Sequence, residues 1–212
     1  MIKEGGIDFI HLKDEDFDAP LGMSSGAGVI FANTGGVMEA ALRTVADILT
    51  GKDLDNFEYQ GVRGLDGVKE ASVVLPIDGK DTEIKVAVAH GTANAAKVLE
   101  AVKKGEKEYH FIEIMACPGG CVHGGGQSHV SAKKRLEVNP KSKRADALYE
   151  LDKSLPLRKS HKNPEVIKLY EEFLKEPNSH VSHKYLHTHY YKRDSYATQE
   201  QEEYDKLMEK LK

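Results

Sequence analysis

Cysteine is scarce in this sequence, tryptophan is missing, and no long apolar run occurs. The 212 residues contain two cysteines and no tryptophan. Low cysteine use, together with the lack of a secretory signal pattern in residues 1–30, predicts a cytoplasmic protein rather than a secreted disulfide scaffold. A transmembrane helix is not expected either, because no run of about 18 apolar residues is present.

An excess of positive charge is also absent. The chain has 30 Lys and Arg against 34 Asp and Glu, a formal net charge of −4. This balance gives no signature of nucleic-acid binding. The mean hydropathy of −0.50 indicates a modest core and much charged surface. The length is enough for one or two domains.

Both cysteines lie in one glycine-rich segment, EIMACPGGCVHGGGQ, at residues 113–127. Thiolates are soft ligands that favour iron–sulfur clusters and zinc. The neighbouring glycines let the backbone approach a bulky inorganic group. The preceding residues 109–116 are rich in aromatic and β-branched side chains and predict a buried strand. The cysteines should therefore follow the C-terminal end of a strand, where open α/β sheets bind ligands.

Two cysteines alone cannot complete a cluster, which needs about four protein ligands. The missing ligands would come from histidines or from another chain. His123 and His129 offer a zinc site of the Cys2His2 type, although the spacing matches no zinc-finger pattern. A disulfide between Cys117 and Cys121 is a further alternative, whereas a radical-SAM site lacks its third cysteine.

The sequence predicts an α/β order of elements over its first two thirds. Residues 26–34 favour an extended segment, and Thr34 is a candidate N-cap for a helix that ends near Gly51. Two strands, 71–76 and 83–90, should be joined by a turn at Asp78 and Gly79. A helix over 91–104 and the strand over 109–116 complete a crossover to a partly parallel sheet. Glu39 and Arg43, one helical turn apart, are most simply a surface ion pair.

The last third should be helical and charged. A basic, polar stretch over residues 131–142 separates it from the preceding part. Helices are predicted over 144–151 and 164–174, the second with Pro164 in its first turn. Residues 180–190 are ambiguous, and residues 200–211 form a short charged helix or a frayed tail.

Three segments together resemble the FeFe (iron-only) hydrogenases. Residues 113–127 are similar to the third cluster-binding motif of that family, and residues 25–43 resemble the segment of its catalytic domain that precedes a long helix. Residues 158–190 resemble its small-subunit segment. The resemblance implies an α/β fold with part of a two-lobed catalytic domain over 1–137, a helical small-subunit-like segment over 138–194 and a charged tail over 195–212.

The resemblance also implies a cofactor and a reaction. The cofactor would be the H-cluster, a 4Fe-4S cubane bridged to a two-iron subsite, and the reaction the reversible reduction of protons to hydrogen. Cys117 would ligate the cubane, and Cys121 would bridge it to the two-iron subsite. Met115 and Phe31 match positions beside that subsite, with ordinary core packing as the alternative for each. The predicted cofactor-binding residues of the loop are Gly124, Gly125, Gly126 and Gln127.

Two earlier motifs of the family, TSCCP and MPCxxKxxE, are absent, and each supplies one cubane ligand. The chain therefore looks like the C-terminal half of a catalytic domain. The expected partners are an N-terminal half with the other two cysteines and a ferredoxin-like electron carrier. Neither a nucleic acid nor a membrane is expected. Smaller departures are Ser128, where the family usually has Pro, and Ala32 and Asn33, where Gly and a small residue are commoner.

Three hypotheses of function follow from this pattern. The chain is a subunit of a split enzyme, a truncated reading of a longer hydrogenase, or a non-catalytic iron–sulfur scaffold or sensor. The C-terminal histidines suggest a metal site at first sight, but the resemblance to a wrapping segment favours a structural role. They are His161, His180, His183, His187 and His189.

Overall fold

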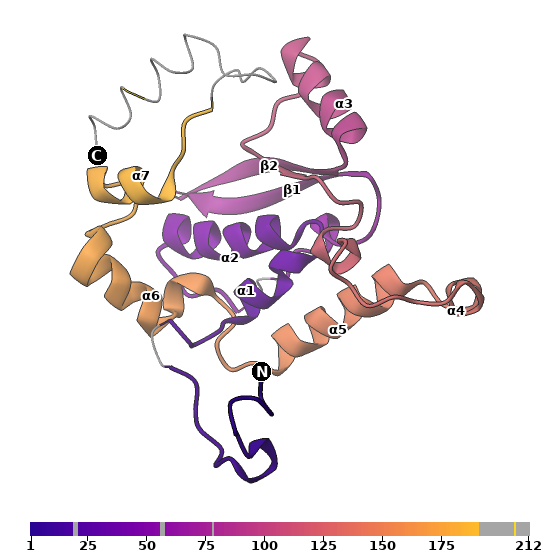
Figure 1. Cartoon of the computed structure of the whole chain (residues 1–212). Helices are drawn as coiled ribbons and strands as arrows, with labels where there is room; N and C mark the ends of the chain where they lie inside the picture. Colours follow the sequence, from indigo (N-terminus) through magenta and orange to yellow (C-terminus); the bar gives the residue numbers. More distant parts are fainter. Residues whose placement is uncertain (19–20, 56–57, 78, 191–205, 207–212) are drawn as a thin grey trace. The chain divides into compact units, whose positions relative to one another are not determined.

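The computed structural model describes residues 1–18, 21–55, 58–77, 79–190 and 206. It divides into one unit over Met1–Ile167 and a second that begins at Lys168. In the first unit, helix α2 (Gly36–Thr50) covers one face of a small sheet and helix α3 (Thr92–Lys103) the other (Figure 1). The predicted α/β class is confirmed.

The sheet of the first unit has three strands in the order β1-β2-β3. Strands β1 (Val68–Ile77) and β2 (Lys80–His90) form an antiparallel hairpin, and Gly79 adopts a φ of 75° in the turn between them. Strand β3 (Phe111–Met115) pairs with β2 in parallel. The predicted strands and the parallel pairing are confirmed, and the hairpin strands are longer than expected.

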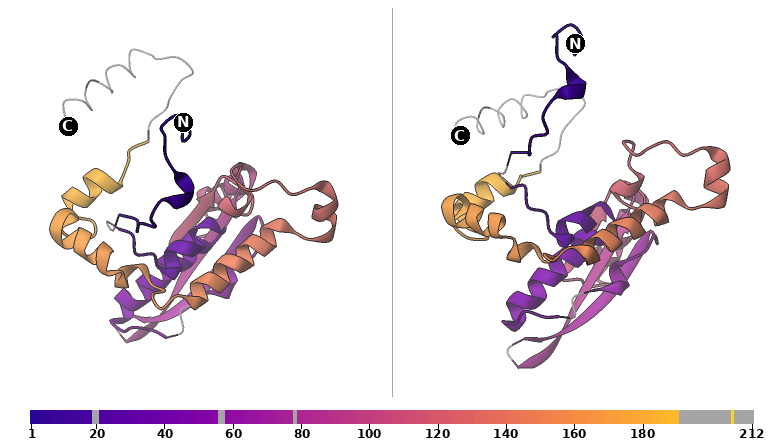
Figure 2. Two further views of the ribbon diagram at one scale, coloured as in Figure 1. Left: turned by 60° about the horizontal axis from the view of Figure 1, so that its bottom comes forward. Right: turned by 90° about the horizontal axis from the view of Figure 1, so that it is seen from below.

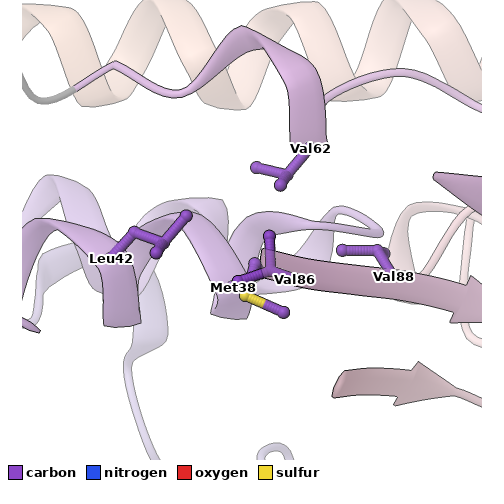
Figure 3. Packing of buried hydrophobic residues seen from close by; sticks show 5 residues of the cluster. All are labelled: Met38, Leu42, Val62, Val86 and Val88. Atoms are coloured by element: carbon purple, nitrogen blue, oxygen red, sulfur yellow. The ribbon is translucent and has the colours of Figure 1, made fainter. Parts of the chain in front are cut away.

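Strand β2 lies in the middle of the sheet, and its C-terminal half is apolar on both faces. Val86 and Val88 contact Met38 and Leu42 of α2 together with Val62 (Figure 3). The alternate residues Ala87 and Ala89 pack with Val98 of α3 in a second cluster on the opposite face of the sheet. Burial on both faces explains why β2 ends in an unbroken apolar run, as central strands between two helical layers do.

Helix α2 starts one residue later than the sequence suggests. Its N-cap is Gly35, at a φ of 89°, and no side chain at this position caps the helix. Thr34 as N-cap is therefore wrong. A Cβ on Gly35 would approach the carbonyl oxygen of Val62 to 1.9 Å, so only glycine fits here. The helix ends at Gly51, whose φ is 63°, as predicted.

The extended segment predicted over residues 26–34 is also wrong. These residues form helix α1 (Gly26–Val29) and the 3-10 helix η2 (Ile30–Ala32). Ser25 caps α1 by accepting a hydrogen bond from the amide of Gly28 at 3.2 Å. The amide of Gly26 donates to the carbonyl oxygen of Leu157, 131 positions further along the chain. Long-range contacts have overridden the β-branched local sequence.

Glu39 and Arg43 are not a surface pair, because both side chains are fully buried. Arg43 donates to Glu39 at 2.7 Å and to both carboxylate oxygens of Asp152 at 2.8 and 2.9 Å. Arg63 also donates to Glu39, and Arg158 donates to Asp152. This buried charge network (Glu39, Arg43, Arg63, Asp152 and Arg158) joins α2 to the segment that follows residue 138.

Helix α5 (Pro140–Ser154), which carries Asp152, packs against α1 and η2. The basic stretch before it forms helix α4 (Ala132–Glu137), at the tip of a projection from the first unit (Figure 2). The predicted helix over 144–151 is confirmed and is longer. The remaining short elements of the first unit are η1 (Phe9–His11), η3 (Gln60–Val62), η4 (Cys121–His123) and η5 (Ser160–Lys162).

Residues 164–174 are helical as predicted, as α6 (Pro164–Leu169) and a π-helical turn, η6 (Tyr170–Leu174). The ambiguous segment forms α7 (His180–Leu186) in the second unit. The predicted charged tail lies outside the described residues, apart from Lys206. Among the described helices, none is long and apolar enough to cross a membrane.

Candidate functional site

Cys117 and Cys121 lie on a tight turn directly after β3. The amide of Gly120 donates to the carbonyl oxygen of Cys117 at 2.9 Å, which closes the turn. Cys121 then begins η4, and its carbonyl oxygen accepts a hydrogen bond from Gly124. Both thiols are free and exposed. The predicted position of the cysteines, on a loop at the C-terminal end of a parallel strand, is confirmed.

The backbone of this cysteine turn (residues 117–121) is fixed from behind. The carbonyl oxygen of Gly119 accepts a hydrogen bond from the amide of Thr34 at 3.1 Å. Arg144 of α5 donates to the carbonyl oxygens of Val122 at 3.0 Å and Ser128 at 2.9 Å. The side chain of Val122 is buried. The turn therefore presents both thiols to solvent on a backbone anchored to the connection between η2 and α2 and to α5.

Gly120 makes the closest approach in this anchor. Its φ is 92°, and a Cβ would lie 2.5 Å from the carbonyl oxygen of Ala32 and 2.8 Å from the amide nitrogen of Thr34. We expect Gly120→Ala to lower the free energy of unfolding by roughly 2 to 4 kcal/mol, because strain at positive φ adds to a clash with backbone. Denaturant unfolding monitored by circular dichroism measures this loss.

Gly125→Ala is the matched control for this substitution. A Cβ at Gly125 meets nothing within 4 Å, and its φ is not in the positive region. Its effect should stay within about 0.5 kcal/mol. Equal effects of the two substitutions would contradict the assigned anchoring role of Gly120.

Glu113, the first residue of the motif, caps helix α2. Its two carboxylate oxygens accept hydrogen bonds from the amides of Gly35 and Met38, each at 2.7 Å. The side chain is buried, with 6% of the residue exposed. A carboxylate at a helix N-terminus satisfies free amides and complements the helix dipole. The strand that leads to the cysteines is thereby tied to the helix behind them.

Lys69 of β1 is buried next to Thr34, the residue whose amide bonds the cysteine turn. Its ammonium group donates to the carbonyl oxygens of Thr34 at 2.8 Å and Gly64 at 2.9 Å. Burial lowers the pKa of Lys69 to about 8, although the negative charge of Glu113 opposes the shift. His90 contacts the Thr34 hydroxyl at 3.2 Å, and burial together with the charge of Lys69 lowers its pKa.

The pKa of Lys69 predicts a change of stability at alkaline pH. Between pH 8 and the ordinary value of 10.5, Lys69 is neutral in the folded chain and still protonated in the unfolded chain. The unfolded state then binds more protons, so the free energy of unfolding rises with pH in this window. Relative to that of Lys69→Met, the free energy of unfolding of the native chain should rise by roughly 2 to 3 kcal/mol between pH 7.5 and 10.5.

The measurement is urea unfolding of both proteins at several pH values. Other lysines and tyrosines titrate in both proteins, so their contributions cancel in the difference. A difference that stays constant, or that shrinks as the pH rises, would contradict a depressed pKa of Lys69.

No third ligand joins the two thiols. Throughout the part of the chain that the structure describes, no group of three or more His, Cys, Asp or Glu side chains is placed to hold a metal ion. The Cys2His2 site with His123 and His129 is therefore not formed, and the free thiols form no disulfide. The donor set present, two soft ligands facing outward, fits a metal group that is shared with a second set of ligands.

The other predicted site residues differ in how far they are buried. Met115 ends β3 and is partly buried, and Phe31 of η2 is 45% exposed. Gly125 and Gly126 are exposed and have open space around them. Gln127 donates from its side chain to the carbonyl oxygen of Cys121 at 3.0 Å. Their cofactor-binding roles stay predictions.

His161 has protein partners. It contacts the hydroxyl of Thr44 at 3.0 Å and the carboxylate of Asp47 at 2.9 Å, both on α2. In the second unit, the rings of His183 and His187 stack with centroids 4.2 Å apart. The structural role predicted for the remaining histidines stays a prediction.

Sequence reasoning missed the supporting residues Glu113, Lys69 and Arg144. Glu113 stood in the motif without a role. A charged residue within an otherwise apolar strand was the available signal for Glu113, since buried charges need dedicated partners. Lys69 is followed by Glu70 in β1 and carries no such signal. No local signal marks Arg144.

The fold and the site together define an α/β protein that presents two exposed thiols on an anchored glycine turn. Comparison with known proteins gives the family. Residues 1–125 match the family "Iron only hydrogenase large subunit, C-terminal domain", and residues 138–193 match "Iron hydrogenase small subunit". The chain belongs to the iron-only hydrogenase family, and its resemblance to that family is confirmed. The exact domain boundaries stay a prediction.

The chain is similar to several hydrogenases and also to a protein that is not named as a hydrogenase. The chain is 50% identical over 193 residues to the NADP-reducing hydrogenase subunit HndD of Solidesulfovibrio fructosivorans, covering 91% of this chain and 32% of that protein. It is 45% identical to iron hydrogenase 1 of Clostridium pasteurianum, covering 91% and 33%. Protein NAR1 of Arabidopsis thaliana is 33% identical, with 90% and 40% covered.

Solved structures give the same family. The FeFe-hydrogenase HydA1 of Chlamydomonas reinhardtii is 40% identical, with a TM-score of 0.62, over 89% of this chain and 52% of that chain. The chain thus spans about half the length of this solved structure and about a third of the two hydrogenases above.

Proposed function

We propose that Cys117 and Cys121 provide two of the cysteine ligands of an H-cluster in an FeFe hydrogenase. The observation that carries this proposal is the pair of exposed thiols on a rigid turn, with no third ligand beside them in the described residues. Two thiolates make half of the roughly four ligands that a cubane needs. Cys117 would ligate the cubane, and Cys121 would bridge it to the two-iron subsite.

When bound, the cluster would supply the redox chemistry for the reversible reduction of two protons to hydrogen. The residues of this chain would hold and shield it. The hydrogen bonds to the backbone of the turn keep both thiols in place, and Met115 and Phe31 would offer apolar surface to the cluster. The glycines Gly124–Gly126 would let main chain approach the cluster closely.

The second half of the site would come from a polypeptide with the TSCCP and MPCxxKxxE motifs. Support comes from β3, which has one edge without a neighbouring strand among the described residues. Phe111 and Ile114 of that strand are 45% and 48% exposed. Exposed apolar groups on a free edge strand favour association with another chain.

A ferredoxin-like protein is the proposed electron donor. The projection formed by α4 and the start of α5 supports a negatively charged carrier, because it is strongly basic and follows the glycine-rich segment that carries Cys121 (Figure 2). Complementary charge raises the rate of such encounters. Its basic residues are Lys133, Lys134, Arg135, Lys141, Lys143 and Arg144.

A non-catalytic iron–sulfur scaffold is the second candidate. The similarity to NAR1, and the 29% identity to a protein of Xenopus tropicalis named a cytosolic Fe-S cluster assembly factor, favour it. The cytoplasmic location stays part of the proposal, and one relative is named a periplasmic hydrogenase large subunit.

Co-expression tests the proposal. The chain is purified alone, and together with a polypeptide that carries both missing motifs and the cluster-maturation proteins. Iron content, dispersity and hydrogen evolution with a reduced dye are then measured under anaerobic conditions. We expect the chain alone to associate and to lack a stable cubane, and the complex to gain solubility, cluster and activity together.

Other outcomes would support one of the alternative hypotheses. A complex with a stable cluster and no hydrogen evolution supports the scaffold. A monodisperse chain that alone holds a stable four-iron cluster and turns over contradicts the half-site. An in-frame MPC motif directly upstream in the gene would identify a truncated reading, and a separate neighbouring gene would identify a split enzyme.

A further inference from the structure

Helix α2 has its charged residues inside and apolar residues outside. Glu39 and Arg43 are fully buried, and Asp47 is 8% exposed. On the flank that faces solvent, Val45 is 38% and Ile48 66% exposed. A surface helix normally has the opposite arrangement, with its charges toward water and its apolar residues toward the core. An apolar outer flank indicates that further protein covers the helix.

The exposed flank is an apolar stripe along the length of α2. Its members follow one another at intervals of three or four residues, which places their side chains on one face of a helix. No charged residue interrupts the series. We call it the outer stripe, and it consists of Val37, Ala41, Val45 and Ile48. Such a series has the form of a helix–helix packing face.

The outer stripe lies on the β3 side of α2. Ile48 and Glu39 are about two and a half turns apart, so their side chains point in opposite directions. Glu39 accepts hydrogen bonds from Arg63, which follows η3, and η3 packs against both α2 and β1. Since β1 and β3 are the two edges of the sheet, the flank with Ile48 is directed toward β3.

Phe111 continues the apolar surface onto the sheet. Glu113 reaches α2, and Phe111, two residues earlier in β3, is therefore on the same face of the sheet. It pairs with Val86, which contacts α2, and it is 45% exposed. The outer edge of β3 has no neighbouring strand among the described residues. The outer stripe, Phe111 and this edge thus form one uncovered corner of the first unit.

We propose that a helix of the second polypeptide packs along the outer stripe, and that a strand of the same polypeptide pairs with β3. This inference rests on the proposed function, which assigns the two missing motifs to that polypeptide. Packed helices lie roughly 10 Å apart, about two strand spacings of 4.8 Å. One additional strand beside β3 therefore gives room for a helix next to α2 that covers Phe111.

Two observations favour this occupant over a second copy of the chain. The chain spans 52% of HydA1, so a length equal to about half of that structure is left to supply the strand and the helix. The cysteine turn directly follows β3. A strand parallel to β3 would end beside this turn, at the sheet edge where ligands of open α/β sheets bind. The loop after such a strand could carry the missing cysteines.

Co-expression tests the docking surface. The full chain is produced with a tagged polypeptide that comprises the part of Chlamydomonas HydA1 not covered by this chain, and the amount of chain recovered on the tag is measured. Ile48→Glu should reduce recovery to about a tenth or less, because an unpaired charge would be buried. Ile48→Lys should have the same effect, and Ile48→Leu should be recovered like the native chain.

Val74→Glu is the matched control for Ile48→Glu. Val74 is 59% exposed and lies on β1, at the other edge of the sheet. We expect its recovery to equal that of the native chain. Circular dichroism of each variant verifies that the fold is kept, as expected for substitutions of exposed side chains.

Hydroxyl-radical footprinting identifies what covers Ile48. Two other isoleucines serve as internal standards, since Ile10 is 86% exposed and Ile30 is fully buried. In a dilute solution of the chain alone, Ile48 should be oxidised about as fast as Ile10. In the complex it should be oxidised as slowly as Ile30. Slow oxidation in the dilute chain alone would show that the chain itself covers the outer stripe, and would overturn the proposal.

The outcomes distinguish this inference from the proposed function. A complex that Ile48→Glu disrupts, but that forms no cluster, would support the docking surface and contradict the H-cluster. Equal recovery of the native chain and Ile48→Glu would overturn the docking surface and leave the H-cluster unaffected. The docking surface would also be refuted if the native chain were not recovered at all, or if Ile48→Glu only separated a dimer of the chain without changing recovery.

Discussion

Hydrogen evolution should be lost when Cys121 is replaced by Ala in the reconstituted complex. Cys121 is the sole candidate in this chain for the bridge between cubane and two-iron subsite, and no other thiol except Cys117 is present to take its place. The fold should change little, because Cys121 is exposed and the turn is held by backbone hydrogen bonds. The assay is hydrogen evolution with a reduced dye, beside circular dichroism and unfolding of the chain.

Ser128→Ala is a suitable control for Cys121→Ala. Ser128 lies on the same exposed loop, and its contact with Arg144 uses only the carbonyl oxygen. Activity near the native rate is expected for the control. If Cys121→Ala kept even about a tenth of the native rate, the bridging role would be refuted, since loss of a cluster ligand should stop the chemistry altogether.

The second large effect concerns stability. We expect Arg43→Met to lower the free energy of unfolding by about 3 to 5 kcal/mol, because it leaves two buried carboxylates with one fewer cation. Arg43 is fully buried and bonds both Glu39 and Asp152. Urea unfolding at neutral pH provides the measurement. The loss should be accompanied by weaker attachment of α5, which increased proteolysis after residue 138 would reveal.

Lys134→Met is the matched control, since it removes a cation of an exposed pair. Lys134 and Glu137 are 59% and 50% exposed. Such pairs contribute about 0 to 1 kcal/mol. If Arg43→Met cost no more than Lys134→Met, the buried charge network would not be what joins α2 to α5.

Local sequence was enough to predict the elements whose own pattern decides their structure. The hairpin of β1 and β2 has an Asp-Gly turn between two β-branched runs, and α2 has apolar residues at helical spacing and a terminal glycine. The same reasoning located the cysteines after a strand. In each case the signal for the element lies within its own residues or in the turn next to it.

Prediction failed where a distant residue decides the structure. Residues 26–32 are helical because their first amides bond to Leu157 and Arg158. Thr34 is not the N-cap because Glu113, 78 positions away from Gly35, already satisfies the start of α2. Glu39 and Arg43 are buried because Asp152 lies 109 positions from Arg43. Periodicity within one helix carries no information about such partners.

The candidate site divides in the same way. The thiols and glycines could be identified from one motif, since ligand type and spacing are local properties. The residues that fix the turn come from α5 and from the connection between η2 and α2, and only the fold brings them together.

The cap supplied by Glu113 has a consequence for how the chain reaches its folded state. Side chains alternate along a strand, so a shift of β3 by one residue against β2 would turn Glu113 away from α2. The helix would lose its cap, a buried carboxylate would lose two donors, and both cysteines would move along the sheet edge. The correct alignment of β3 is therefore stabilised by its contact with α2, a helix that lies much earlier in the sequence. A misaligned strand cannot make this contact, so the same contact that caps the helix also favours the correct position of the cysteines.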